Sequence, residues 1–236
     1  MATLQRYEDF HKKHEAKKVP FTKDNYEKFF FDEYNIRLGK DLTFDMSERI
    51  YEAFQKLPPL ITKSNFIARI EINKDLGEPH VFYPNHGRWD NKLHCMYLNP
   101  LTVMSTDYMH LITHEAGHAV DHLLGPGEKN ISMEPAWLAL SGWTMLPPEL
   151  NTDRVDDETY YTQGEYKRLS LRDDDKLMLA RWWHKKNAKF ARWYGTRDPR
   201  EDFAECFSYL CIGQDKRVPP NKAKFIRELM KKKESK

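Results

Sequence analysis

Two histidines and a glutamate stand in a pattern that suits a bound metal ion. His114 and His118 are four residues apart, and Glu115 directly follows the first of them. On a helix, residues four apart share a face, so both imidazoles can turn a nitrogen toward one ion. Glu115 is rotated away from that pair and can reach a water on the ion rather than the ion itself. The pattern predicts a zinc site with its own general base.

The segment around this motif has the features of a helix. Ser105 or Thr106 can cap its start, Asp107 suits its first turn, and Gly125 followed by Pro126 ends it. We therefore expect the two histidines to lie near the middle of a helix, on a rigid element.

Further histidines stand one turn to either side of the pair, at His110 and His122. A turn is about 3.6 residues, so a ladder at four-residue steps drifts around the helix and cannot converge on one ion. We interpret His110 and His122 as flanking residues, either supporting the site or exposed. Gly117 costs the helix about 1 kcal/mol relative to alanine, which indicates that another backbone packs closely there.

A zinc ion held by two histidines needs a third protein ligand and one open position. A second helix is predicted to begin at Asp198 and Pro199. On one face it carries Glu201 and Glu205, one turn apart. We choose Glu201 as the third ligand, and we expect Glu205 to accept a hydrogen bond from the far nitrogen of a ligating histidine. The apolar stripe of this helix comprises Phe203, Phe207 and Leu210.

Each assignment has an ordinary alternative. The histidine pair could be a chance match on an amphipathic helix. Glu201 could close a capping box with Asp198, and Glu205 could be a surface carboxylate. The combination of the histidine motif with two downstream acids favours the metal site over these separate explanations.

The combined motifs resemble the anthrax lethal factor and Pro-Pro endopeptidase family of zinc metallopeptidases. The resemblance covers about residues 105–212 and rests on His-Glu-Ala-Gly-His-Ala-Val-Asp at 114–121, on Tyr194, and on Glu-Asp-Phe-Ala-Glu at 201–205. It implies a Zn2+ cofactor and a protein or peptide substrate. The roles it implies are zinc ligation by His114, His118 and Glu201, general-base catalysis by Glu115, and oxyanion stabilisation by Tyr194; Asp121 and Glu205 match further positions of the pattern.

A second resemblance leaves the third ligand open. Residues 195–198 read Gly-Thr-Arg-Asp, which is similar to the Gly-Thr-x-Asp element of the deuterolysin-like zinc peptidases, where the aspartate is the ligand. Those peptidases continue with x-x-Tyr-Gly, and acidic residues stand there in this chain. Asp198 therefore remains a rival to Glu201. A metzincin pattern is excluded, because its glycine and third histidine positions hold Asp121 and Leu124.

The pattern of the whole chain indicates an α+β fold of zincin-like type. We expect a single catalytic domain over residues 1–236. Its N-terminal part (1–60) is helical, its middle part (61–125) holds a small twisted sheet and the active-site helix, and its C-terminal part (126–236) is a mainly helical lobe with the third ligand.

Alternation of apolar and polar residues predicts a strand at 66–73, and shorter candidates follow at 80–84 and 92–100. Residues 85–90 are interpreted as a loop. The strand at 92–100 could be an exposed edge that pairs with an extended peptide, or an ordinary covered strand.

Further helices are expected on either side of the sheet. Asp45 and Glu48 have the spacing of a capping box, and the helix they open should bury Ile50, Ala53, Phe54 and Leu57 before it ends at Pro58. A long helix is predicted from about Lys176 to Tyr194.

Composition narrows the class of protein. The chain has 236 residues, a formal net charge of +2 and 3 Cys. The near-neutral balance favours neither nucleic acid nor membrane as a partner, although Lys231–Lys233 is a basic run. The sparse cysteines suggest free thiols. We expect a cytoplasmic protein, or one delivered without a classical signal peptide, and favour a monomer.

The sequence therefore predicts a zinc-dependent endopeptidase, and a toxin or effector protease is one form that it could take. The alternative is a catalytically silent, zinc-stabilised protein-binding module. Glu115 argues against that alternative, because a purely structural zinc site needs no general base.

Overall fold

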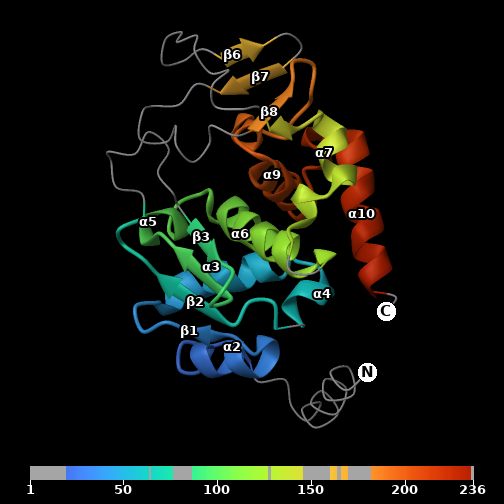
Figure 1. Cartoon of the computed structure of the whole chain (residues 1–236). Coiled ribbons are helices and arrows are strands. Elements are labelled where there is room, and N and C mark those ends of the chain that lie inside the picture. Colours follow the sequence, from blue (N-terminus) through green and yellow to red (C-terminus); the bar gives the residue numbers. More distant parts are fainter. Residues whose placement is uncertain are drawn as a thin grey trace.

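The computed structural model describes residues 20–63, 65–76, 87–126, 129–145, 160–163, 166–169 and 182–234. In these ranges the chain forms an α+β structure with two four-stranded sheets, which confirms the predicted class (Figure 1). The strand expected at 80–84 lies outside the described residues. None of the helices in these ranges is long and apolar enough to cross a bilayer.

The first sheet has the strand order β1-β2-β4-β3. Strands β1, β2 and β4 are parallel, and β3 runs antiparallel to β4. The bounds are β1 Arg37–Leu38, β2 Arg69–Ile72, β3 Gly87–Asp90 and β4 Cys95–Leu98. One prediction was wrong here, because the expected loop at 85–90 contains β3. Of the two alternatives for the strand at 92–100, the structure shows the covered one, because β4 lies between β2 and the edge strand β3.

The local sequence does not predict β3, because an edge strand needs few apolar side chains. Trp89 is the residue of this strand that packs against the hydrophobic core, and Gly87 and Arg88 precede it. Glycine is rare in strands, so the segment resembles a loop. Its pairing with β4 supplies the order that the local sequence does not indicate.

Four helices share one hydrophobic core with the first sheet. They are α2 Tyr26–Tyr34, α3 Phe44–Phe54, α4 Pro59–Thr62 and α5 Pro100–Val103. The four predicted inward residues of α3 and its extension are buried, as expected: Ile50, Ala53, Phe54 and Leu57. The predicted capping box was misplaced, because Thr43 is the N-cap and accepts a hydrogen bond from the Met46 amide at 3.3 Å. Asp45 lies in the first turn instead.

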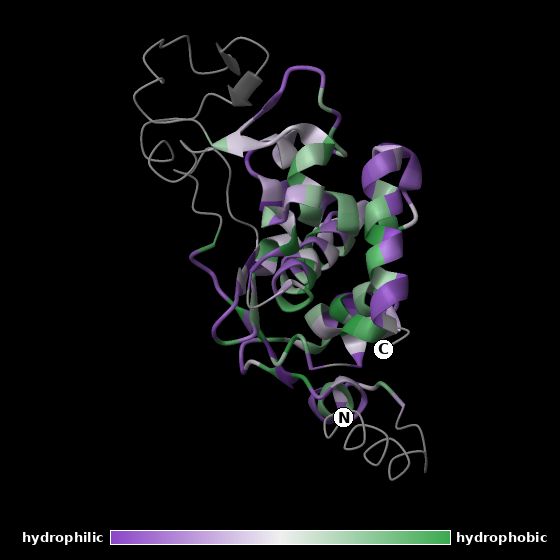
Figure 2. Ribbon diagram, turned by 45° about the vertical axis from the view of Figure 1, so that its right-hand side comes forward, coloured by the Kyte–Doolittle hydropathy of each residue, from purple (hydrophilic) through white to green (hydrophobic). Residues whose placement is uncertain are grey.

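The central helix α6, Tyr108–Leu123, packs against α3 and β3 on one side and against α9, Pro199–Cys211, on the other (Figure 1). The remaining elements of the C-terminal half are η2 Ile131–Met133, α7 Pro135–Ser141, η4 Trp193–Thr196, η5 Asp215–Arg217 and α10 Pro220–Glu234. Helix α10 turns hydrophobic residues toward the protein and hydrophilic ones outward (Figure 2).

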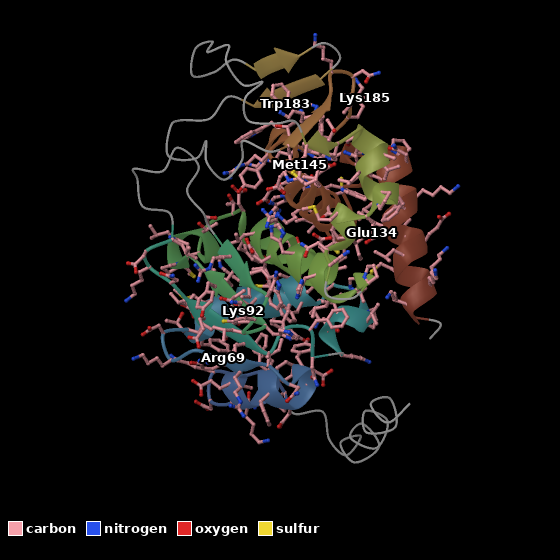
Figure 3. All side chains as sticks on the ribbon, in the orientation of Figure 1. Arg69, Lys92, Glu134, Met145, Trp183 and Lys185 are labelled. Carbon is pink, nitrogen blue, oxygen red and sulfur yellow. The ribbon has the colours of Figure 1, made fainter. Side chains whose placement is uncertain are left out.

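A second sheet stands where the sequence predicts helix. Its order is β5-β8-β7-β6, with β5 Thr144–Met145, β6 Tyr160–Gln163, β7 Tyr166–Leu169 and β8 Trp182–Lys185. Figure 3 labels Met145, Trp183 and Lys185 on the paired strands. The helix expected over 176–194 is therefore wrong from residue 182 onward, and residues 176–181 lie outside the described residues. Aromatic residues favour strands, and β8 gains its partners from segments far upstream.

The three cysteines are free thiols, as predicted. Cys95 and Cys206 are buried and Cys211 is partly buried.

Candidate metal centre

Helix α6 presents the histidine motif from a rigid, buried position. It begins after Asp107, and ten of its residues, including His114 and Glu115, are buried. The predicted cap at Ser105 or Thr106 is not the N-cap. Ser105 instead accepts a hydrogen bond from the Asp107 amide at 3.1 Å, one turn before the helix.

Helix α9 begins as predicted, with Asp198 as N-cap and Pro199 in the first turn. The Asp198 carboxylate accepts hydrogen bonds from the amides of Arg200 at 2.8 Å and Glu201 at 3.2 Å, and it pairs with the Arg200 side chain at 3.4 Å. The Asp198 carboxylate is therefore engaged in capping α9. Among the described residues, Asp198 belongs to no cluster that could hold a metal ion.

A glycine lets the two helices approach closely. A Cβ added at Gly117 would lie 2.9 Å from the Cα of Ala204 and 3.2 Å from its carbonyl oxygen. This explains why α6 carries a residue that weakens a helix. The prediction of a close backbone at this glycine is confirmed.

The close approach brings three predicted ligands together. The Nε2 atoms of His114 and His118 lie 3.1 and 3.4 Å from Oε2 of Glu201. One ligand atom from each residue lies within 4.8 Å of the other two. Two imidazole nitrogens and one carboxylate oxygen are the donor set of catalytic zinc sites. The cluster therefore fits the ion that the sequence predicts.

The charges of the cluster also suit a cation. Burial alone would raise the pKa of Glu201, but His118 and His114 outweigh it and hold that pKa well below its usual range. Burial opposes the charged forms of both histidines, yet contacts with Glu201 raise their pKa values. The carboxylate is thus held ionised between two imidazoles. A divalent cation would take the place of the protons on the imidazoles, because metal ligands bind in their deprotonated forms.

Glu115 lies between this cluster and the edge strand. Burial raises its pKa, while the charges of His118 and His114 and a hydrogen bond from the Trp89 backbone oppose that rise. A Cβ added at Gly87 would lie 2.6 Å from Oε1 of Glu115. The other oxygen, Oε2, is buried without a hydrogen-bond partner among the described residues. A carboxylate with one bare oxygen beside the ligands can accept a proton.

Tyr194 lies in η4, which packs against α9. Its ring centroid is 5.9 Å from that of His114. Arg197 lies over the tyrosine ring, with 4.7 Å from Cζ to the centroid, and its Nη1 donates to the tyrosine oxygen at 2.6 Å. Burial raises the pKa of Tyr194, and Glu201 raises it further. The phenol therefore stays protonated near neutral pH and can donate a hydrogen bond.

Glu205 lies on the far side of His114 from Glu201. Its Oε1 is 3.4 Å from His114 Nδ1, and its Oε2 is 3.2 Å from Nε2 of His110. Burial would raise the pKa of Glu205, but these two histidines lower it to about 2. The structure thus brings Glu205 to the nitrogen of His114 that faces away from the ligand cluster, at ion-pair distance. The hydrogen bond that the sequence predicts is not formed there, because Nδ1 of His114 is buried without a hydrogen-bond partner among the described residues.

Asp121 supports the end of α6 instead of contacting a ligand directly. Its carboxylate accepts hydrogen bonds from the Ser132 amide at 2.6 Å, the Ser132 hydroxyl at 2.7 Å and the Asn130 side chain at 2.9 Å. These bonds tie η2 to α6. Nδ1 of His122, at the same end of α6, lies 3.4 Å from the side-chain oxygen of Asn130, a residue that also bonds to Asp121.

Sequence reasoning missed three neighbours of the site. Gly87 and Trp89 lie on β3, where the sequence predicts a loop, and Arg197 has no role of its own in the Gly-Thr-x-Asp resemblance. A signal for Arg197 does exist, because it lies three residues after Tyr194 and on a helical turn would share its face.

Comparisons of this chain with family models, with curated proteins and with solved structures found no match. The function is therefore argued from the chemistry of the site.

Proposed function

We propose that this protein is a zinc-dependent endopeptidase with a zincin-like arrangement, in which His114, His118 and Glu201 hold the ion. The observation that supports this most is the position of Glu115. Its buried carboxylate stands between the three-residue cluster and the edge strand β3, with one oxygen bare. A structural zinc site has no use for such a group, so the silent binding module explains less of the site.

Each side chain would have a definite task in peptide hydrolysis. When bound, zinc would activate a water molecule and polarise the scissile carbonyl. Glu115 would accept a proton from the attacking water and pass it to the leaving amine as the C–N bond breaks. Tyr194 would donate a hydrogen bond to the carbonyl oxygen, where negative charge develops. Since Arg197 donates to the oxygen of Tyr194, the phenolic proton remains free for that bond.

The edge strand would align the substrate. β3 is the last strand of its sheet, so one row of its backbone groups has no strand beside it among the described residues. An extended peptide can add to such an edge through backbone hydrogen bonds. Because Gly87 of β3 adjoins Glu115, a peptide paired there would pass beside the general base.

The substrate proposed for this site is an extended segment of a protein or peptide. A cytoplasmic enzyme and a toxin or effector delivered into another cell would both suit this site.

The decisive experiment compares the wild type with Glu115→Gln. The variant should retain zinc, because Glu115 lies outside the ligand set, and should lose cleavage of a proteome-derived peptide library. Glu228→Gln, at an exposed position of α10, is the matched control and should behave as the wild type. Zinc content is measured by elemental analysis and cleavage by mass spectrometry. Normal cleavage by Glu115→Gln, or no cleavage by zinc-loaded wild type, would overturn the proposal.

A further inference from the structure

His110 makes a contact that the proposed mechanism does not use. It lies one turn before His114 on α6, and its Nε2 is 3.2 Å from Oε2 of Glu205. The other oxygen of Glu205 is 3.4 Å from Nδ1 of His114, whose Nε2 is 3.1 Å from Glu201. These contacts form a continuous line from His110 through Glu205 and His114 to the ligand cluster.

We propose that His110 is a positioning residue that holds Glu205 against His114 and so fixes the ring that presents Nε2 to the metal. The inference rests on the proposed metal site and adds His110 to the residues on which the ion's affinity depends. It does not depend on which bond the enzyme cleaves.

The geometry gives His110 this task because a glutamate carboxylate can rotate. Glu205 is almost fully buried, with a side-chain exposure of 2%, so both oxygens need donors. When His110 binds Oε2, the plane of the carboxylate is fixed and Oε1 faces His114. A carboxylate that accepts from the far nitrogen of a ligating histidine sets the orientation and tautomer of the ring.

Two contacts hold His110 itself in place. Its ring centroid lies 4.9 Å from that of Tyr209. The Ser208 hydroxyl donates to its backbone carbonyl at 3.1 Å, and the same hydroxyl lies 2.7 Å from that of Thr113. These contacts join α6 to α9 next to Glu205. The imidazole is therefore pre-organised for Glu205, as a residue that positions a ligand must be.

The same three side chains could instead hold a second ion. His110, His114 and Glu205 each offer a ligand atom, and these atoms lie within 4.8 Å of one another. A second ion would require Nδ1 of His114 to lose its proton while Nε2 binds the first ion. It would also take Glu205 away from its task at Nδ1. The positioning role needs neither change, so we favour it, and metal stoichiometry separates the two.

The test measures zinc affinity directly, by titrating metal-free protein in competition with a chromogenic chelator. His110→Phe keeps a ring against Tyr209 but loses the N–H donor, and it should bind zinc about 10–100-fold more weakly than the wild type. His110→Gln restores a donor and should recover most of that loss. His122→Phe, on the same helix but bonded elsewhere, is the control and should bind zinc as the wild type does. The visible spectrum of the Co2+-loaded protein should change with His110→Phe and return with His110→Gln.

Four results would overturn the inference. They are wild-type affinity in His110→Phe, an equal loss in His122→Phe, no recovery in His110→Gln, and a wild type that binds two zinc ions where His110→Phe binds one. If His110→Phe does not fold, His110→Ala takes its place. The titration needs no substrate, so a zinc-binding protein that cleaves nothing would refute the proposed function and leave this inference standing.

Discussion

Glu201 and Glu205 lie on one face of α9 but contact different nitrogen atoms of the histidines. Glu201 faces Nε2 of both His114 and His118, whereas Glu205 faces Nδ1 of His114 and the ring of His110. Both carboxyls have a lowered pKa despite burial. One turn of helix thus separates the acid that we propose as a metal ligand from the acid that we propose orients a ligating histidine.

At the scale of single residues, Tyr194→Phe should lower turnover and leave the zinc content unchanged. The change removes one hydrogen-bond donor from the developing oxyanion and no metal ligand. Removal of such a donor costs other enzymes about 10²–10³ in kcat. Steady-state kinetics on a cleaved peptide gives kcat, and elemental analysis gives zinc. A variant that loses zinc would show that Tyr194 serves the metal rather than the oxyanion.

At the scale of elements, a buried ion pair fixes α9 against its surroundings. Nζ of Lys222, on α10, lies 2.7 and 2.8 Å from the two oxygens of Asp202, and both side chains are 1% exposed. Asp202 also accepts from the Ser141 hydroxyl at 3.2 Å and the Trp143 indole at 3.1 Å. Since Asp202 directly follows Glu201, this network holds the start of α9 in front of the histidines.

Lys222→Met should therefore destabilise the protein strongly. It leaves the Asp202 carboxylate buried without its cation, which costs about 3–5 kcal/mol in comparable cases. The double variant Asp202→Asn with Lys222→Met should recover much of that loss, because no unpaired charge remains. Chemical unfolding measures both. Lys224→Met, in an exposed pair of the same helix, is the control and should change the free energy of unfolding little. A Lys222→Met protein as stable as this control would contradict the ion-pair argument.

At the scale of the whole molecule, the cluster lies where two halves meet. Helix α6 packs on α3 and β3, and α9 packs on η2, η4 and α10, so ligands on α6 and α9 would tie both halves to one ion (Figure 1). An ion that binds the folded protein and not the unfolded chain stabilises it by mass action.

Removal of zinc should therefore lower the melting temperature of the wild type. A protein with free zinc at 100 times its Kd gains about 2.7 kcal/mol from the ion. The check is differential scanning calorimetry with and without a chelator. His118→Ala, which lacks one ligand, should melt at nearly the same temperature in both conditions. An equal chelator effect in this variant would show that the ion acts at another place.

Local patterns were sufficient for the parts that a single helix can specify. The spacing of His114 and His118, the cap at Asp198 and the inward residues of α3 follow from the period of a helix and from its end chemistry. The close backbone beside Gly117 can also be predicted locally, because close packing compensates for the cost of a glycine inside a helix. These features depend on residues within a few positions of one another.

Local sequence patterns could not predict the edge strand β3 or the second sheet. β3 contains one core-packing side chain, and β8 lies within the range where a helix is predicted. Strand identity here depends on partners that are distant in sequence, and tertiary pairing outweighs local preference. The capping residues of α3 and α6 were misplaced by one or two positions for the related reason that several adjacent residues could cap.

The candidate chemistry follows from the amino-acid sequence alone: two imidazoles on one helical face, an adjacent base, and acids on a later helix. Which acid reaches the imidazoles depends on the fold, since Asp198 caps α9 while Glu201 lies within 3.4 Å of both. The fold also places Gly87 against Glu115 and brings His110 within hydrogen-bond distance of Glu205. Helical period fixes where side chains lie around one axis, but the distance between two helices is set by how their faces pack, and that packing joins residues far apart in the chain.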